Sequence, residues 1–231
     1  ADKSAGVPCR HLAKDFRCAI HQDLAESGLN GCLAYDCFGA GQKVARKLYR
    51  QADWRTSPPL AKEMFGVFLV VFRLHQMLWY LVEAASLVPA APCQGEIHAL
   101  ITENQRLTRL PPKALLQFQL TPYHQRVSRL LKDLCARICT AGKQCPDAIG
   151  KRFRKENLRQ MDFSMCLLIA ADLRESDFYG ASFLGADLRD ANLKDADLRE
   201  SIFLTQGQVN AAKGNAGTKL PAALHTPAHW L

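Results

Sequence analysis

The sequence lacks a long uncharged apolar run. Its longest stretch of this kind, Met64 to Phe72, is ended by Arg73 and is far shorter than the roughly 20 residues that a transmembrane helix requires. No signal peptide is visible at the N-terminus. These absences predict a cytoplasmic protein that does not interact with a membrane.

Signatures of catalytic sites are also lacking. The phrase Gly39-Ala40-Gly41-Gln42-Lys43 fits neither the phosphate loop nor the dinucleotide fingerprint, so it predicts a turn that leads into a helix. No nucleophile–base pair and no suitably placed carboxylate pair is apparent. The isolated histidines of the middle region are expected to be structural: His75, His98 and His124. Whether the protein is an enzyme stays uncertain, and a non-enzymatic role is favoured.

The composition is that of a folded protein with an uneven charge distribution. Apolar residues make up 48% of the chain and charged residues 23%, which is enough apolar material for a sizeable core. Residues 156–205 carry five basic and ten acidic side chains, whereas residues 1–155 have a net charge of +11. A basic front of this kind favours phosphates or acidic partners, or it is simply a solvated surface.

The middle of the chain predicts a helical bundle. Residues 60–88 are apolar on nearly all faces and form the expected central helix. Further helices are expected at about 95–107 and 123–140, with a short helical turn at 113–119 and a basic linker at 141–155. The helix after Gly41 carries a candidate basic patch, which is either a nucleic-acid contact or, more simply, a solvated helix face: Lys43, Arg46, Lys47 and Arg50.

Residues 156–205 repeat with a period of five. Ten units follow one another without a gap, from ENLRQ to SIFLT, and the first residue is small in eight of them. The third residue is always Leu or Phe: Leu158, Phe163, Leu168, Leu173, Phe178, Phe183, Leu188, Leu193, Leu198 and Phe203. A fixed period of this kind indicates stacked units that share one core.

This pattern resembles the pentapeptide-repeat family. The resemblance implies a right-handed quadrilateral β-helix with four five-residue sides per coil, whose first and third residues point inward. Residues twenty apart would then stack, with Phe163, Phe183 and Phe203 in one column, and ten units would make about two and a half coils. Glu156 and Met161 are too large for the small inward site, so we expect an open first coil that the helical bundle covers.

The end of the chain predicts a cap. Thr205-Gln206-Gly207-Gln208 has the form of a helix N-cap with Gln at the third helical position, and a short helix would end near Gly214. The tail that follows is expected to pack Trp230 against the last coil. This segment resembles the terminal cap of some bacterial pentapeptide-repeat proteins.

Four of the nine cysteines lie near the N-terminus. The stretch from Pro8 to His21 resembles the later half of the bacterial CxxCxxCC family, which is thought to chelate zinc or iron. The resemblance implies a zinc or iron site, an iron–sulfur cluster included, with these candidate ligands: Cys9, Cys18, Cys32, Cys37, His11 and His21. Four thiolates would suffice for tetrahedral zinc, but buried or free thiols and disulfides are alternatives.

Two further cysteines, Cys135 and Cys139, are four residues apart on the helix at 123–140 and share a face. A second metal site with Cys145 and His124 is conceivable. The core spacing of the neighbouring apolar residues favours buried small side chains instead.

We therefore predict an α+β protein with two domains. Residues 1–150 form a Cys-rich helical domain, and residues 151–231 form the β-helix at 156–205 with its cap at 206–231. The favoured function is a non-enzymatic scaffold that binds a protein partner, in antibiotic resistance or in regulation, and carries a structural metal. One alternative is a metal- or cluster-dependent enzyme or redox sensor. Another, implied by relatives that protect DNA gyrase, is a DNA mimic, which the short rod and its net charge of −5 disfavour.

Overall fold

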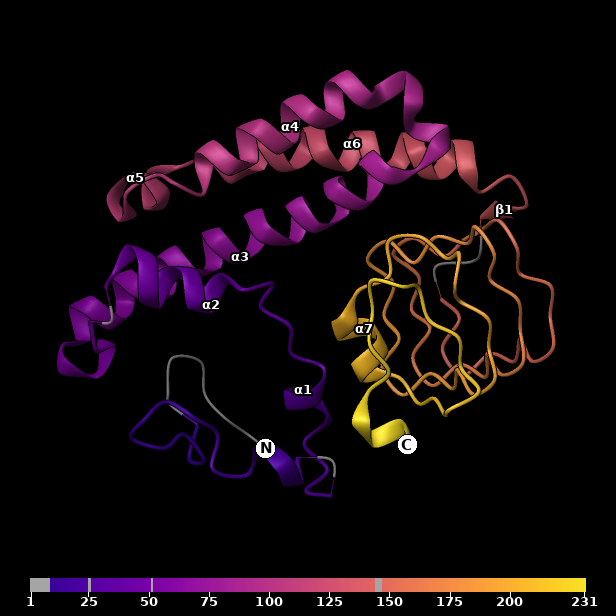
Figure 1. Cartoon of the computed structure of the whole chain (residues 1–231), viewed down its shortest axis with the longest axis horizontal. Coiled ribbons are helices and arrows are strands. Elements are labelled where there is room, and N and C mark those ends of the chain that lie inside the picture. The colour runs from indigo at the N-terminus through magenta and orange to yellow at the C-terminus, as the bar shows by residue number, and fades with distance from the viewer. Residues whose placement is uncertain (1–8, 25, 51, 144–146) are drawn as a thin grey trace.

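The computed structural model describes residues 9–24, 26–50, 52–143 and 147–231. An N-terminal segment holds five short helices: η1 (His21–Asp23), α1 (Asn30–Leu33), α2 (Ala40–Gln42), η2 (Lys43–Leu48) and η3 (Trp54–Thr56). A bundle follows, formed by α3 (Pro58–Ser86), η4 (Val88–Cys93), α4 (Gln94–Leu107), α5 (Pro112–Gln117) and α6 (Leu120–Ile138). The remaining elements are β1 (Gly142–Lys143), β2 (Met161–Asp162), α7 (Gln206–Ala211) and η5 (Ala228–Trp230). The helices of the N-terminal segment and the bundle lie in a different region of the molecule from the repeats at 156–205 (Figure 1).

Helix α3 is the centre of the bundle. It has prolines in its first turn, where the missing amide proton costs no hydrogen bond, and it packs against α4, α5 and α6. The side chain of Asn104 joins three helices, because its Nδ2 donates to the carbonyl of Leu74 at 2.9 Å and to the hydroxyl of Tyr123 at 3.0 Å. All four helices expected in this region are present, with ends within three residues of the prediction.

By length and composition, α3 is also apolar enough to cross a membrane. Its most apolar window of 18 residues has a mean hydropathy of 1.6, and 33% of that window is buried. Its buried side packs on the other helices, as the core helix of a bundle does. The prediction from the sequence considered only the uncharged run up to Phe72 and so underestimated the apolar length of this helix.

Residues 147–205 are called the repeat stack below, and within them parallel bridges join residues that are twenty positions apart. Four rows of parallel bridges run through it, for example from Asp147 to Leu167 to Asp187. The chain turns at the fifth residue of most units, where φ is positive even in non-glycine residues such as Met165 and Ala170. The period of five is therefore the distance from one turn to the next.

The interior of the stack is apolar. All ten Leu and Phe residues at third positions are buried, and the rings of Phe163 and Phe183 stack with centroids 5.5 Å apart and an interplanar angle of 10°. The column of three rings that the sequence predicted ends at Phe183. Phe203 has a φ of 60° and packs edge-to-face on Tyr80 of α3, while Leu204 joins the core of the stack. The third ring leaves the column because the backbone departs from the repeat conformation at this unit.

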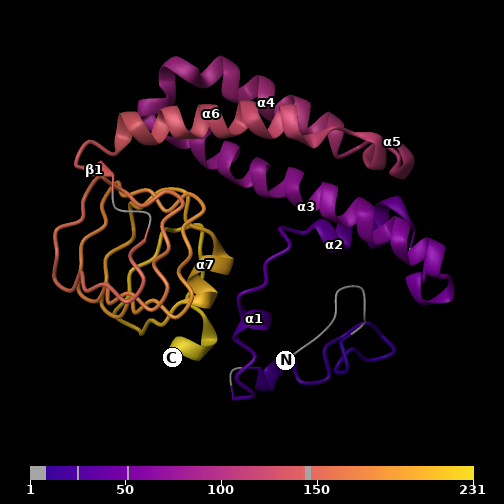
Figure 2. The same cartoon turned by 180° about the vertical axis from the view of Figure 1, so that it is seen from behind.

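Two expectations about the start of the stack were wrong. Residues 147–155 of the predicted linker at 141–155 are part of the stack, because Arg152 pairs with Asp172 and Ala148 is fully buried. The bundle does not cover the open first coil. It lies along one side of the stack, which Figure 2 shows from behind. That side carries small or apolar side chains such as Ser182, on which a helix can pack closely.

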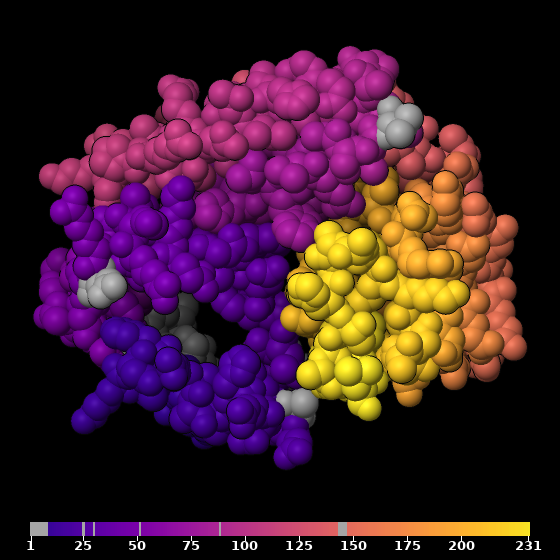
Figure 3. Space-filling view, in the orientation of Figure 1, coloured from indigo at the N-terminus to yellow at the C-terminus, as the bar shows by residue number. Residues whose placement is uncertain are grey.

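The cap agrees with the prediction. Thr205 and Gln208 form a capping box at the start of α7, and the indole of Trp230 donates to the carbonyl of Ala212 at 3.0 Å. The ring of Trp230 lies directly against Gly214, where a side chain would collide with it. The N-terminal segment meets this end of the stack, since Asn210 donates to the carbonyl of Leu33 (Figure 3).

Candidate functional site

The second and fourth residues of the repeat units form the outer surface of the stack. We distinguish four faces by their rows: the covered face (161–165, 181–185, 201–205), the apolar face (147–150, 166–170, 186–190), and two charged faces (151–155, 171–175, 191–195 and 156–160, 176–180, 196–200). Because the interior uses first and third residues, these outer positions are free to serve solubility or binding.

Helix α6 lies on the covered face through Cys135, and Cys139, which directly follows the helix, contacts the edge of the neighbouring face. The sulfur of Cys135 is 3.3 Å from the hydroxyl of Ser182, and Cys139 donates to the carbonyl of Gly180 at 3.7 Å. Burial raises the pKa of Cys139 to about 12, so this side chain stays a neutral thiol. Both cysteines are buried, as expected, and they pack at an interface. Cys145, a candidate ligand of a second metal site, lies outside the described residues.

Helix α3 closes the same face at the last coil. Oε1 of Glu83 accepts a hydrogen bond from the backbone N–H of Phe203 at 2.6 Å. Burial raises the pKa of Glu83 to about 7, although this hydrogen bond opposes the shift. Burial, with the nearby charge of Glu83, also raises the pKa of Tyr80 to about 12. A titratable group therefore sits between the bundle and the stack.

On the charged faces, acidic and basic side chains pair with one another. Asp172 and Asp197 pair with the arginines two residues later, at 2.7 and 2.6 Å, and these hydrogen bonds hold the pKa of both carboxyl groups at about 2. The guanidinium of Arg159 lies 4.2 Å from the centre of the Tyr179 ring. Duplex DNA presents a continuous row of unpaired charges, about one per 1.7 Å. Paired charges of both signs do not imitate such a row.

Second-position side chains also support the backbone. In most units this side chain accepts a hydrogen bond from the N–H two residues later, as Asp177 does from Tyr179 at 2.9 Å. The same bond is made from these positions: Asp147, Asn157, Asp162, Asp172, Ser182, Asp187, Asn192 and Asp197. Two apolar residues take the position instead, Ile202, which is buried, and Leu167, which is not.

The apolar face is exposed. Its large side chains are accessible to solvent by 52% at Ile149 and 41% at Leu167, Ile169 is half-buried beside them, and Met165, at the turn from the covered face, is 66% exposed. Sequence reasoning missed these residues. The signal was present in the unit CLLIA, which has Leu and Ile at positions where its neighbours carry Asp and Arg. These side chains form a candidate binding site on the stack.

The candidate metal ligands are not assembled. Cys9 and His11 lie close together, since the N–H of His11 donates to the sulfur of Cys9 at 3.5 Å, and Cys37 donates to the side chain of Gln42. Cys18 pairs with Leu12 in a short hairpin, Cys32 lies in α1, and His21 lies in η1. Within the described ranges, no three His, Cys, Asp or Glu side chains could hold an ion together. The arrangement does not fit a metal centre, and the site stays a prediction from the sequence.

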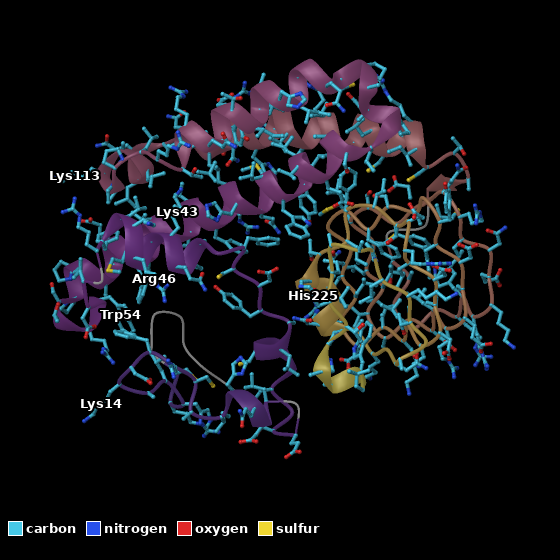
Figure 4. All side chains as sticks on the ribbon, in the orientation of Figure 1. Lys14, Lys43, Arg46, Trp54, Lys113 and His225 are labelled. Atoms are coloured by element: carbon cyan, nitrogen blue, oxygen red, sulfur yellow. The ribbon has the colours of Figure 1, made fainter. Side chains whose placement is uncertain are left out.

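Three residues of the basic patch lie on η2, a widened helix with π-type hydrogen bonding, and Arg50 follows this helix. Burial and the neighbouring Arg109 lower the pKa of Lys43. None of the four patch residues forms an ion pair within the described part of the chain. Figure 4 shows Lys43 and Arg46 at the end of the bundle that is far from the repeat stack.

A pocket of about 350 Å³ lies where the N-terminal segment meets α3. It is lined by Asp36, Phe38, His75, Leu78, Trp79 and Val82. Nδ1 of His75 is 2.8 Å from the carbonyl of Phe38, and burial lowers the pKa of this imidazole, so it is neutral at pH 7. His75 therefore supports the fold of the N-terminal segment, as expected of a structural histidine.

Comparison with known proteins places these features in a family. The model of the family described as pentapeptide repeats matches residues 166–203, with eight copies. A protein of Bacillus subtilis (strain 168), described as "Uncharacterized protein YybG", is 45% identical over 240 residues. That similarity covers 99% of this chain and 85% of the relative, so it includes the bundle and the cap as well as the repeats.

Proposed function

Because this chain belongs to the pentapeptide-repeat family, we propose that it is a non-enzymatic scaffold whose repeat stack binds a protein partner through the apolar face. One observation carries the proposal: Ile149, Met165 and Leu167 are large exposed apolar side chains in adjacent units of the stack, although the same face also carries Asp147 and the paired Asp187 and Arg189. Contiguous exposed apolar side chains on a folded protein mark interaction surfaces.

The covered face of the same stack shows how an apolar face of this kind packs against another surface. On the covered face, Ser182, Leu184 and Ile202 replace the Asp and Arg residues of the charged faces, and the bundle packs on them. The apolar face makes the same kind of replacement at Leu167 and Ile169, yet no described segment covers it. A protein surface rich in apolar side chains, such as one face of a helix, would complete this packing.

Leu167 supports the proposal because it lacks the local hydrogen bond that polar residues make at the equivalent position of other units. A polar residue at this position would accept a hydrogen bond from the N–H of Ile169, as its equivalents do from the N–H two residues later. Such a bond contributes about 1 kcal/mol to stability. A leucine that is exposed and also omits a local hydrogen bond is difficult to explain by folding alone.

The scaffold is proposed to be a short right-handed quadrilateral β-helix. The twenty-residue pairing, the turns at fifth positions and the buried third positions support this assignment. The rise per coil would be close to the strand spacing of about 4.8 Å. A structural zinc or iron bound by the front cysteines is a separate hypothesis, supported by the resemblance of residues 8–21, and the binding role does not depend on it.

Site-specific photo-crosslinking in cells tests the proposal. A photoreactive amino acid is placed at Leu167, or at Tyr179 on a charged face as a matched control with a similar exposure of 46%. We expect a defined protein adduct from position 167, which contains a polypeptide other than this chain and is absent from position 179. Leu167→Asp, introduced beside a photoreactive residue at Met165, should abolish the adduct.

Leu167→Asp is designed to keep the fold intact. Asp at this position restores the local hydrogen bond, which offsets its repulsion from Asp147 and Asp187 in the same row, so the free energy of unfolding should stay within about 1 kcal/mol of that of the wild type. Loss of the adduct without loss of stability supports a binding surface. Equal adducts from positions 167 and 179, or an adduct that survives Leu167→Asp, would refute the proposal.

A further inference from the structure

The side of α3 that faces away from the bundle core combines apolar and basic side chains. Together with its neighbour α5 it forms a surface that we call the outer face of α3: Lys62, Phe65, Leu69 and Arg73 from α3, and Lys113 and Leu116 from α5. Residues 62, 65, 69 and 73 are three or four positions apart, so they share one side of the helix. On α5, Lys113 and Leu116 are three apart and share a side as well.

The apolar side chains of this face are accessible and adjacent. Leu69 is 61% exposed, and Phe65 and Leu116 are also exposed. Leu116 lies directly over Gly66, where an added Cβ would be 2.8 Å from its Cδ2, so the absence of a side chain lets α5 approach α3. Phe65 contacts Trp54, with ring centroids 5.4 Å apart. The result is one apolar area rather than scattered single residues.

The cations of this face have no acidic partners. Among the described residues, neither Lys62, Arg73 nor Lys113 forms an ion pair. Helix α3 contains two acids, and both are engaged elsewhere: Glu63 accepts from the hydroxyl of Tyr49 at 2.8 Å, and Glu83 accepts from Phe203. The face therefore presents uncompensated positive charge around an apolar centre.

We propose that the outer face of α3 docks on an anionic lipid surface. Phe65, Leu69 and Leu116 enter the boundary between headgroups and acyl chains, and Lys62, Arg73 and Lys113 lie at the level of the acidic headgroups. This distribution, with Phe and Leu between Lys and Arg on one side of a helix, suits an interfacial helix. Each cation near an anionic membrane adds about fivefold to the binding constant.

The hydropathy of α3 supports a lipid partner. Only 33% of its most apolar window is buried, so many apolar side chains of this helix are at least partly accessible. The helix lies on the membrane and does not cross it, because its other side carries the core residues Val67, Val71 and Leu74. A nucleic acid would also be attracted by the cations, but the aliphatic Leu69 and Leu116 offer a phosphate backbone nothing to bind.

The basic patch on η2 extends the positive surface of the same end of the bundle. Figure 4 shows Lys43, Arg46 and Lys113 at this end, far from the repeat stack. Docking through this end would leave the apolar face of the stack free, so lipid binding and protein binding can occur together.

Vesicle co-sedimentation of the full chain tests the proposal. The probes are vesicles of phosphatidylcholine alone and vesicles of phosphatidylcholine and phosphatidylglycerol in equal parts. We expect binding to the second only, weakened by salt. Leu69→Gln should lower the partition coefficient about tenfold through the lost apolar contact. Lys62→Gln with Arg73→Gln should lower it about 25-fold at low salt.

Val82→Gln is the matched control. Val82 is an exposed apolar residue of the same helix, at 55%, but it lies on another side, away from these cations. It should bind anionic vesicles like the wild type. All variants replace exposed side chains, and circular dichroism checks that they fold. No binding to anionic vesicles, or equal binding by Leu69→Gln and the wild type, would overturn the proposal. Stronger binding of a short DNA duplex than of anionic vesicles would also overturn it.

Discussion

Replacing Glu83 with glutamine should raise the free energy of unfolding at about pH 8 and leave it unchanged at about pH 4. In the wild type, burial between α3 and the last coil raises the pKa of Glu83 from 4.5 to about 7. Between these two values the folded chain holds a proton that the unfolded chain has released. The free energy of unfolding therefore falls as the pH rises through this window.

The size of the effect follows from the shift in pKa. One pKa unit corresponds to about 1.4 kcal/mol, so the wild type should lose up to about 3 kcal/mol between pH 4.5 and pH 7 because of this group. Glutamine has no charge to bury and keeps an oxygen that accepts from Phe203. Leucine removes the acceptor and leaves the N–H of Phe203 unpaired, which costs about 1–3 kcal/mol at every pH.

Urea unfolding followed by circular dichroism, at several pH values from 4 to 8, measures these differences. Comparing each variant with the wild type at the same pH cancels the contribution of other groups, such as His75. The reasoning fails if the stability difference between Glu83→Gln and the wild type does not change with pH. It also fails if Glu83→Leu is as stable as Glu83→Gln at about pH 8.

Two further predictions concern the cap and the front cysteines. Gly214→Ala should lower the free energy of unfolding by about 1–3 kcal/mol, because the new methyl group collides with the ring of Trp230. The same change at Gly95, which lies in α4 with open space around it, should leave the free energy of unfolding unchanged or raise it by up to about 1 kcal/mol, because alanine is favoured over glycine in a helix. If the front cysteines bind a structural metal, the purified protein will contain close to one zinc or iron per chain, and Cys9→Ser with Cys18→Ser will remove it. A metal-free protein that is fully folded would end that hypothesis.

The sequence predicted the parts of the fold that depend on local patterns. The limits of the bundle helices follow from prolines and apolar periodicity, and the capping box at Thr205 follows from two side chains three residues apart. The buried third positions follow from the five-residue period. Each of these signals is contained within a short stretch of chain, so neighbouring residues alone are enough to read it.

Features that depend on distant contacts were not predictable in the same way. The unit KRFRK, residues 151–155, has Phe153 at the third position, as a repeat unit does. Its first residue is a lysine, however, and its high charge is typical of a linker, so the sequence pattern did not identify it as a repeat unit. The covering of one side of the stack by α6 depends on where the bundle ends relative to the first coil. The front cysteines lie in a segment with little periodicity, and no short-range pattern specifies which of them approach one another.

A repeat fold separates the residues that make it stable from those that it can use for binding. First and third residues fill the interior, so they reveal the architecture and little else. Second and fourth residues lie outside, and most of them here are Asp, Asn, Arg or Lys that bond to the backbone or to each other. An apolar residue at an outer position is explained by the fold only if neighbouring residues of the same chain bury it. The bundle buries Ile202, but Leu167 stays 41% exposed, and that difference argues for a partner.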